Sequence, residues 1–269
     1  MENSIKTSSL SVGYDGNIII PDFNIDFLKG KITSIIGPNG CGKSTILKAM
    51  GRILKANKGD VFILDKNIKN LNTKDIAKMM SILPQSPQVN GSVSCFELVS
   101  YGRYPYQKGF GKLSNEDKEI INWALSVTNM SEYKSRPIMS LSGGQRQRVW
   151  IAMCLAQQTG IILLDEPTTY LDLCHQLEVL ELLKYLNKTQ KTTIIMVLHD
   201  LNLASKYSDY LLSMKDGTVY SYGSPSEVFT KEMLLDCFNI VGEIELDKKS
   251  NKPLCVSYEL KGNKYEDKK

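Results

Sequence analysis

The sequence predicts an α/β fold in which a parallel sheet is joined to an antiparallel β layer and carries an inserted helical subdomain. Two runs, "IILLD" at 161–165 and "TTIIMVLHD" at 192–200, are apolar along their length, as strands buried on both faces of a parallel sheet are. The first ninety residues instead alternate short β-type runs with turns. Residues 93–140 contain helical stretches and no convincing strand.

The elements can be placed in chain order. Strands are expected at "ITSIIG" (32–37) and "VFIL" (61–64), and the turns "YDGN", "FLKGK" and "ANKGD" separate the strands of the β layer. Helices are expected at "SCFELVSYG" and "NEDKEIINWALSVTNM", inside the inserted subdomain. A further helix follows Asp172, a suitable N-cap, and completes a β–α–β unit. Its leucines at helical spacing are Leu173, Leu177, Leu180 and Leu183.

A single domain is expected to cover residues 1–269. Its α/β core with the β layer takes 1–92 and 141–240, and the helical subdomain takes 93–140. The remaining 241–269 are expected to form a hairpin, because "GEIELDKKSNKPLCVSY" alternates around a polar turn, followed by a solvated mixed-charge tail, "NKYEDKK".

Composition excludes several classes of protein. Of the 269 residues, 42% are hydrophobic and 23% are charged, as in an ordinary globular protein with a full core. The net charge of +4 is mild and dispersed, so no nucleic-acid partner is expected. No apolar run reaches the length of about 18 residues that a membrane span needs, and the N-terminus lacks a signal-peptide layout. The six cysteines are scattered, which fits a cytoplasmic protein.

A phosphate-binding loop is indicated by "GPNGCGKST" at 37–45, which matches G-x-x-x-x-G-K-[ST]. An apolar strand precedes it and "KSTILKAM" opens a helix behind it, which is the setting of a P-loop NTPase with a RecA-like parallel sheet. Backbone N–H groups would cradle phosphates, Lys43 would reach the β and γ groups, and the Ser44 hydroxyl would hold Mg²⁺. The residues expected to bind nucleotide are Gly37, Pro38, Asn39, Gly40, Cys41, Gly42, Lys43, Ser44 and Thr45.

Two adjacent carboxylates end a buried strand in "IILLDEP" at 161–167. Open α/β folds bind ligands at the carboxyl ends of their strands, so the pair is expected at the phosphate site. Asp165 would join the magnesium shell, and Glu166, which points elsewhere, would contact the attacking water. Taken alone, the pair could simply close a strand before Pro167; the phosphate loop upstream favours the catalytic interpretation.

The positions of three further side chains indicate possible roles at the phosphate site. His199 ends the strand expected beside that of Asp165, so it would donate a hydrogen bond near the γ-phosphate, whereas His175 is expected on a helix surface. Gln85, in "ILPQSP", could touch a metal-bound water without adding charge. Tyr14, before a turn, could stack on adenine or cover an edge strand.

A second glycine-rich segment, "LSGGQRQRV" at 141–149, runs into a predicted helix. Free N–H groups and the helix dipole at such a terminus favour an anion. The segment contains neither an acid nor a general base, and another phosphate loop already lies far upstream. The sequence alone therefore leaves open which phosphate this segment binds.

These motifs, in this order and spacing, resemble those of the nucleotide-binding subunits of ABC transporters over nearly the whole chain. "GPNGCGKST" is similar to their Walker A, "IILLDEP" to their Walker B, "LSGGQ" to their signature and "TTYLD" to their D-loop. Gln85 lies where their Q-loop lies, His199 where their switch histidine lies, and Tyr14 where their adenine-stacking aromatic lies. The resemblance implies an ATPase that binds ATP and Mg²⁺.

The resemblance also implies a role for "LSGGQ". In this family two copies pack head to tail, and the signature of each closes on the nucleotide held by the other. Ser142 and the N–H groups of Gly143 and Gly144 would contact the partner's γ-phosphate, and the helix from Gln145 onward would add its dipole to this nucleotide-binding segment. Asp172 would help to connect the two sites.

Other roles follow from the same resemblance. The implied catalytic residues are Lys43, Gln85, Glu166 and His199, and the implied metal-binding residues are Ser44, Gln85 and Asp165. Residues 86–106 would dock integral permease subunits at the cytoplasmic face of the membrane. Similarity in "YGRYPY", "LDLCHQLEVLELL" and "VLHDLNLA" points to importers of ferric siderophores, which use an extracytoplasmic substrate-binding protein. Haem, cobalamin or another metal chelate is the alternative cargo; a soluble non-transport ABC ATPase and a P-loop kinase are further alternatives.

Cys41 suggests a separate hypothesis. It lies beside Lys43 and a helix N-terminus, both of which lower the pKa of a thiol. Thiol reagents are therefore expected to inactivate the ATPase, and MgATP is expected to protect it, unless another cysteine is responsible.

Overall fold

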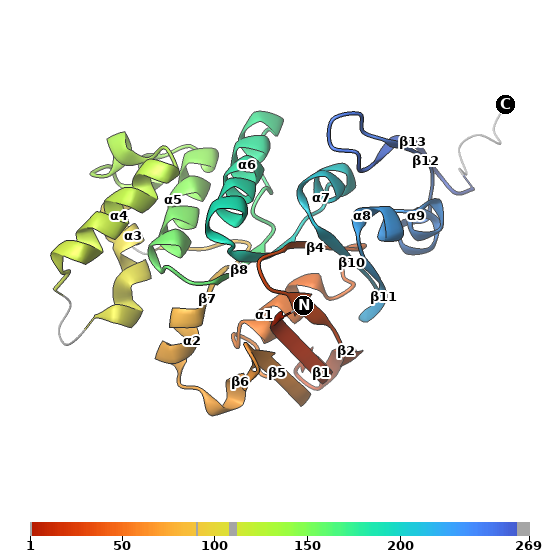
Figure 1. Ribbon diagram of the computed structural model, residues 1–269, viewed down its shortest axis with the longest axis horizontal. Coiled ribbons are helices and arrows are strands. Elements are labelled where there is room, and N and C mark those ends of the chain that lie inside the picture. The colour runs from red at the N-terminus through yellow and green to blue at the C-terminus, as the bar shows by residue number, and fades with distance from the viewer. Residues whose placement is uncertain (1, 90, 108–111, 263–269) are drawn as a thin grey trace.

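The computed structural model describes residues 2–89, 91–107 and 112–262, and Figure 1 shows their arrangement. A six-stranded sheet has the order β11-β10-β4-β9-β8-β7. Its strands are β4 (Ile32–Ile36), β7 (Met80–Leu83), β8 (Ile161–Asp165), β9 (Thr193–Val197), β10 (Tyr210–Lys215) and β11 (Thr218–Gly223). Neighbouring strands are parallel except for β10 and β11. β8 and β9 are buried throughout, which confirms the expectation from their continuous apolar runs, and β4 is buried throughout as well.

A second sheet is antiparallel, as the sequence predicts. Its strands are β1 (Asn3–Tyr14), β2 (Asn17–Phe23), β3 (Asp26–Leu28), β5 (Lys58–Ile63) and β6 (Lys66–Asn67). β1 pairs with β2, β3 and β5, and β5 pairs with β6. β5 stops before Leu64, which the sequence places in the strand, because the φ of 46° at Leu64 turns the backbone out of the extended region.

The six-stranded sheet carries helices along its length. α1 (Lys43–Met50) follows the phosphate loop, and α6 (Leu173–Gln190) joins β8 to β9. Asp172 caps α6, since its Oδ1 accepts a hydrogen bond from the His175 N–H at 3.0 Å; this confirms the predicted N-cap. Leu180 and Leu183 are buried, but Leu173, in the first turn, is 64% exposed. The remaining helices here are α2 (Thr73–Met79), α7 (Leu201–Tyr207), α8 (Pro225–Val228), α9 (Lys231–Phe238) and the 3₁₀ turn η1 (Ile68–Asn70).

The inserted helices form a lobe at one end of the molecule (Figure 1). They are α3 (Cys95–Ser100), α4 (Asn115–Val127) and α5 (Gly143–Ala156), with the 3₁₀ segments η2 (Tyr101–Tyr106), η3 (Ser131–Tyr133) and η4 (Ile138–Ser140). Ser94, Ser114 and Ser142 each begin a helix with a reciprocal capping box. α5 packs against α3 and α4, although the expected division of the chain places it with the α/β core.

The chain continues into the expected hairpin, β12 (Ile240–Leu246) and β13 (Pro253–Leu260), which packs on α9 and α7 (Figure 1). The mixed-charge tail at 263–269 lies outside the described residues. Within the described ranges, no helix combines the length and the apolar character needed to cross a membrane. The core lies on both faces of the six-stranded sheet: one apolar cluster joins it to α1 and the β layer, and the other joins it to α6 and the helical lobe.

Candidate functional site

A cleft of about 600 Å³ opens at the C-terminal edge of the six-stranded sheet, next to the β layer. The predicted residues that line this cleft are Tyr14, Asn39, Gly40, Gly42, Lys43, Ser44, Thr45, Gln85, Glu166 and His199. They come from the end of β1, the phosphate loop with the start of α1, and the segments that follow β7, β8 and β9. The fold therefore brings five distant parts of the sequence to one place.

The phosphate loop connects β4 to α1 and is shaped by its glycines. Gly37 has a φ of 151° and Gly42 a φ of 99°. A Cβ atom on Gly37 would lie 2.4 Å from the carbonyl oxygen of Met214, so only glycine fits there. Nζ of Lys43 donates hydrogen bonds to the carbonyl oxygens of Gly37 at 2.8 Å and Pro38 at 2.9 Å. The loop thus holds the ammonium group of Lys43 where it can contact phosphate oxygens.

Asp165, at the end of β8, is 1% exposed and keeps one oxygen free. Its Oδ1 accepts a hydrogen bond from Ser44 Oγ at 2.7 Å, while its Oδ2 is buried with no hydrogen-bond partner among the described residues. Burial raises the pKa of this carboxyl, against the effect of the Ser44 hydrogen bond, because the charged form is desolvated. A hard divalent cation would satisfy the free oxygen, so Ser44 and Asp165 fit Mg²⁺.

Glu166 has a φ of 55°, a left-handed conformation of the kind that clusters at functional sites. Its Oε1 lies 2.6 Å from Nε2 of His199. Its Oε2 accepts hydrogen bonds from Nε2 of Gln85 at 2.7 Å and from Oγ1 of Thr169 at 2.9 Å. Burial alone would raise the pKa of this carboxyl, but the interactions with His199, Thr169 and Gln85 outweigh burial and lower the pKa. Three side chains therefore hold an ionised carboxylate in place.

Sequence reasoning missed the roles of Thr169 and Tyr170 in this cleft. The Thr169 N–H donates to the carbonyl oxygen of Glu166 at 3.3 Å, and this turn returns the Thr169 hydroxyl to the carboxylate. A hydroxyl residue three positions after a carboxylate is the signal that could have revealed the contact, because that spacing allows a tight turn. Tyr170 is 88% exposed and projects from the same turn beside the cleft.

Cys41 does not have the reactive thiol that its sequence neighbours predict. Its side chain is only 4% exposed, and burial raises the pKa of the thiol although the nearby charge of Lys43 opposes this. The expected lowering of the pKa is therefore wrong, because the Cys41 thiol is desolvated on the inner side of the loop. Cys174, which is exposed, is the cysteine that thiol reagents reach most easily.

The signature residues form the N-terminus of α5 and do not line the cleft. Ser142 Oγ accepts a hydrogen bond from the Gln145 N–H at 3.2 Å, and Gln145 Oε1 accepts one from the Ser142 N–H at 3.1 Å. Gly144 packs against the ring of His175, which is half-buried there instead of lying on an open helix surface. A Cβ added to Gly143 would meet no described atom within 4 Å. The packing of this chain alone therefore does not require glycine at position 143.

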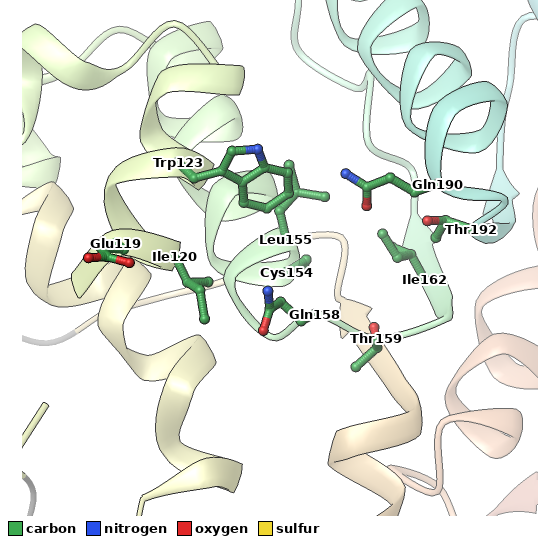
Figure 2. Close-up of a pocket in the computed structure, with 10 residues that line it drawn as sticks. All are labelled: Glu119, Ile120, Trp123, Cys154, Leu155, Gln158, Thr159, Ile162, Gln190 and Thr192. Carbon is green, nitrogen blue, oxygen red and sulfur yellow. The ribbon is translucent and has the colours of Figure 1, made fainter. Parts of the chain in front are cut away.

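A different cavity, of about 460 Å³, lies at the opposite end of the parallel strands (Figure 2). Trp123 of α4 and Leu155 of α5 form one wall, while Ile162 of β8 and Thr192, just before β9, lie on the other side. No predicted site residue lines this cavity. The candidate chemistry is therefore concentrated at the C-terminal edge of the sheet, where the phosphate loop lies.

A family model described as "ABC transporter" matches residues 20–169, which is 150 of the 269 residues and includes the phosphate loop, Gln85 and both carboxylates. The chain belongs to the ABC transporter family. Its curated ABC relatives match along nearly their whole length. The iron(3+)-hydroxamate import ATP-binding protein FhuC of Bacillus subtilis is 55% identical, over 98% of both chains.

Two further ABC relatives are named for the transport of petrobactin and ferric enterobactin. The petrobactin import ATP-binding protein FpuD of Bacillus anthracis is 46% identical over 96% of this chain and 94% of its own. The ferric enterobactin transport ATP-binding protein FepC of Escherichia coli is 38% identical over 94% of this chain and 93% of its own.

Solved ABC structures share the fold. An inward-facing transporter of the metal-chelate type aligns with a TM-score of 0.82 at 28% identity, over 95% of this chain and 97% of that chain. A dimeric ATP-binding cassette in a post-hydrolysis state, bound to ADP and phosphate, aligns with a TM-score of 0.72 at 28% identity, over 82% of this chain and 98% of that chain. The predicted P-loop NTPase fold is thereby confirmed.

Proposed function

We propose that this ABC protein is the ATP-hydrolysing subunit of an importer of ferric siderophores. The observation that carries the proposal is the 55% identity, over 98% of both chains, with an iron(3+)-hydroxamate import ATP-binding protein. Relatives named for petrobactin and enterobactin support the same class of cargo, a ferric chelate. The cleft of this chain suits a nucleotide, so the cargo itself binds to other subunits.

Different residues of the cleft would bind different parts of the nucleotide. Tyr14 is 42% exposed at the cleft, where its ring can stack on adenine. Loop N–H groups and Lys43 would bind the phosphates, and Ser44 and Asp165 would hold Mg²⁺, which would neutralise charge at the phosphates. Gln85, which lines the same cleft and donates to Glu166 at 2.7 Å, would join the metal shell.

Glu166 is the proposed base of ATP hydrolysis. Its carboxylate is ionised, so it can accept a proton from the water that attacks the γ-phosphate. In the described state both of its oxygens are engaged. If His199 turned to the γ-phosphate, Oε1 would become free for that water, and a turn of Gln85 away from Glu166 would remove one of the two bonds to Oε2. Thr169 keeps the carboxylate oriented through Oε2.

A second copy of the chain is the proposed cover of the nucleotide. Gly143 supports this proposal. Neither the backbone conformation of Gly143 nor the packing around it within this chain requires glycine, whereas a phosphate held by a second copy would need the space that a side chain at position 143 would fill. Ser142 and Gln145 hold the N-terminus of α5 in the capped form that presents its N–H groups. The dimeric ATP-binding cassette among the solved structures is consistent with this arrangement.

Permease subunits are the proposed membrane partners, at the cytoplasmic face. The proposed docking surface is residues 86–106, of which residue 90 lies outside the described part. Tyr101 is 53% exposed and Tyr104 is 74% exposed on η2, so two large side chains are free for a partner. An extracytoplasmic substrate-binding protein would deliver the chelate to the permease.

Uptake of radiolabelled ferric hydroxamate tests the function. A native strain lacking this chain should lose uptake, and the wild-type chain should restore it. Glu166→Gln should bind ATP but fail to restore uptake, with an ATPase rate lower by at least about a hundredfold. Glu132→Gln, a matched change of an exposed glutamate outside the cleft, should restore uptake fully.

The results of these experiments test the cargo, the import function and the role of Glu166 separately. Loss of haem or cobalamin uptake in the deletion strain, with ferric hydroxamate uptake intact, would overturn the siderophore assignment while keeping the importer. Full uptake of every chelate in the deletion strain would overturn the import function. Normal hydrolysis by Glu166→Gln would remove Glu166 from its proposed role.

A further inference from the structure

The C-terminal hairpin is fastened along the helix that follows His199. Oδ1 of Asn202 accepts a hydrogen bond from the Cys255 N–H at 2.8 Å, and its Nδ2 donates to the carbonyl oxygen of the same residue at 3.1 Å. One turn further along α7, buried Ser205 Oγ donates to the carbonyl oxygen of Pro253 at 2.7 Å. The side chains of Asn202 and Ser205 on α7 are therefore both hydrogen-bonded to the backbone of β13.

The two ends of α7 are held in different ways. At the C-terminal end, Tyr207 Oη donates to Glu181 Oε1 of α6 at 2.8 Å, and Ser208 Oγ donates to Ser34 Oγ of β4 at 2.6 Å. These bonds fix that end to the core. Among the described residues at the N-terminal end of α7, Asn202 makes side-chain hydrogen bonds to another element. The side chain of Asp200 accepts a hydrogen bond from the Leu203 N–H, within the first turn of the helix.

The N-terminal end of α7 also lies against empty space. A pocket of about 310 Å³ lies beside it, between α7, α9 and the hairpin, and His199, Asn202, Phe238 and Tyr258 are among the residues that line it. On the side of the pocket, this end of the helix faces a space instead of packed side chains. The hydrogen bonds of Asn202 to Cys255 therefore have more influence on where the segment sits.

We propose that the hairpin positions His199 over Glu166, and that Asn202 is the positioning residue. His199 precedes the N-cap of α7 by one residue, so a shift of this end of the helix moves the imidazole. The imidazole lines the nucleotide cleft beside Glu166, so such a shift would also change its distance to a γ-phosphate bound there. The inference rests on the proposed ATP hydrolysis, for which His199 must reach the γ-phosphate.

ATPase kinetics of the purified full-length chain give the first test. Asn202→Ala should lower kcat about tenfold, since a catalytic group displaced by a fraction of an ångström reacts more slowly. KM for ATP should stay within about twofold, because the side chain of Asn202 bonds to the hairpin, whereas the loop proposed to bind the phosphates lies between β4 and α1. In a His199→Ala background, Asn202→Ala should cause no further loss.

Asn187→Ala is the matched control. Asn187 likewise makes two side-chain hydrogen bonds to the backbone, in which its Nδ2 donates to the carbonyl oxygens of Gly30 at 3.0 Å and Thr192 at 2.8 Å, at the opposite end of the parallel strands. This variant removes the same kind of side chain, so it should cost similar thermal stability. Its kcat should equal that of the wild type.

Histidine NMR gives a reading that does not depend on catalysis. The chain has two histidines, His175 and His199, so ¹³C-labelled histidine gives two sets of ring signals, assigned with His199→Ala. Asn202→Ala should move the His199 signals and leave those of His175 unchanged, and Asn187→Ala should move neither. Unmoved His199 signals together with an unchanged kcat would overturn the proposal. A wild-type chain without ATPase activity would instead overturn the proposed function, while the NMR signals would still decide the positioning.

Discussion

At the scale of single residues, Thr169 is the contact with the most direct catalytic consequence. Its hydroxyl holds Oε2 of Glu166 at 2.9 Å, and the other two partners of the carboxylate are the ones proposed to leave when ATP binds. Thr169→Val keeps the shape and removes the hydroxyl, so Glu166 loses its remaining orienting bond. We expect kcat to fall about tenfold with KM for ATP unchanged, measured by phosphate release.

Thr169→Ser is the matched control for that substitution. It keeps the hydroxyl, so it should retain most of the wild-type kcat. Equal rates in the valine and serine variants would show that the hydrogen bond seen here plays no part in hydrolysis.

The residues of the cleft differ in how far the sequence alone predicts them. Lys43 and Glu166 could be identified because each follows a readable strand and belongs to a motif of known chemistry. The Thr169 contact depends on the φ of 55° at Glu166, and sequence gives no direct signal for that angle. Cys41 was misjudged because its burial is set by residues distant in the sequence: its carbonyl oxygen accepts a hydrogen bond from the N–H of Gly217.

At the scale of elements, a buried ion pair joins η2 to α4. Arg103 Nε donates to Asp117 Oδ1 at 2.8 Å, and the two side chains are 4% and 10% exposed. Arg103 also donates to the carbonyl oxygen of Ala156, at the end of α5, at 2.8 Å. One guanidinium therefore connects three elements of the helical lobe.

The stability of the helical lobe should depend on pH through Asp117. Burial alone would raise the pKa of Asp117, but Arg103 and the Ser114 N–H and hydroxyl outweigh it, and the pKa is lowered. A carboxyl with a folded pKa below its unfolded value stabilises the fold above the unfolded value of about 3.9, and that stability is lost as the pH falls through the folded pKa. Asp117→Asn should cost about 3 kcal/mol of unfolding free energy at pH 7.

Urea unfolding at pH 7 and at about pH 3, below the unfolded pKa, measures this dependence. The wild type should lose more stability between these pH values than Asp117→Asn does, because the variant has no carboxyl to protonate. Asp60→Asn removes an exposed carboxylate paired with Lys69, and it should leave stability nearly unchanged at pH 7. Identical pH profiles for the wild type and Asp117→Asn would contradict the assignment.

The elements themselves were largely predictable, and the exceptions have a physical cause. Continuous apolar runs gave β8 and β9, and capping residues such as Asp172 marked helix starts, because these signals are local. Whether α5 belongs to the core or to the helical lobe depends on packing with α3 and α4. No local pattern in the sequence of α5 encodes that packing.

At the scale of the whole molecule, the proposed head-to-tail dimer would make each nucleotide site from two chains. Lys43→Ala removes the loop cation, and Gly143→Asp fills the space left open at the start of α5. Each variant alone should lack ATPase activity. An equal mixture should regain up to about a quarter of the wild-type rate, since half of the dimers pair one chain of each kind and such dimers contain one intact site.

Phosphate release from the separate and mixed variants measures the effect. A mixture no more active than its components would contradict a site shared between two copies. Thermal unfolding of Gly143→Asp should match the wild type, because the added side chain meets no described atom of its own chain.

Lys43 is bonded to its own loop, and both oxygens of Glu166 are bonded to neighbouring side chains. A lone copy of the subunit is therefore held inactive, because Lys43 and Glu166 stay hydrogen-bonded to other groups of the same chain until nucleotide and a second copy displace those bonds. Single copies that have met neither nucleotide nor a second copy then stay idle. The cell can therefore hold a reserve of this subunit without spending ATP on unpaired chains.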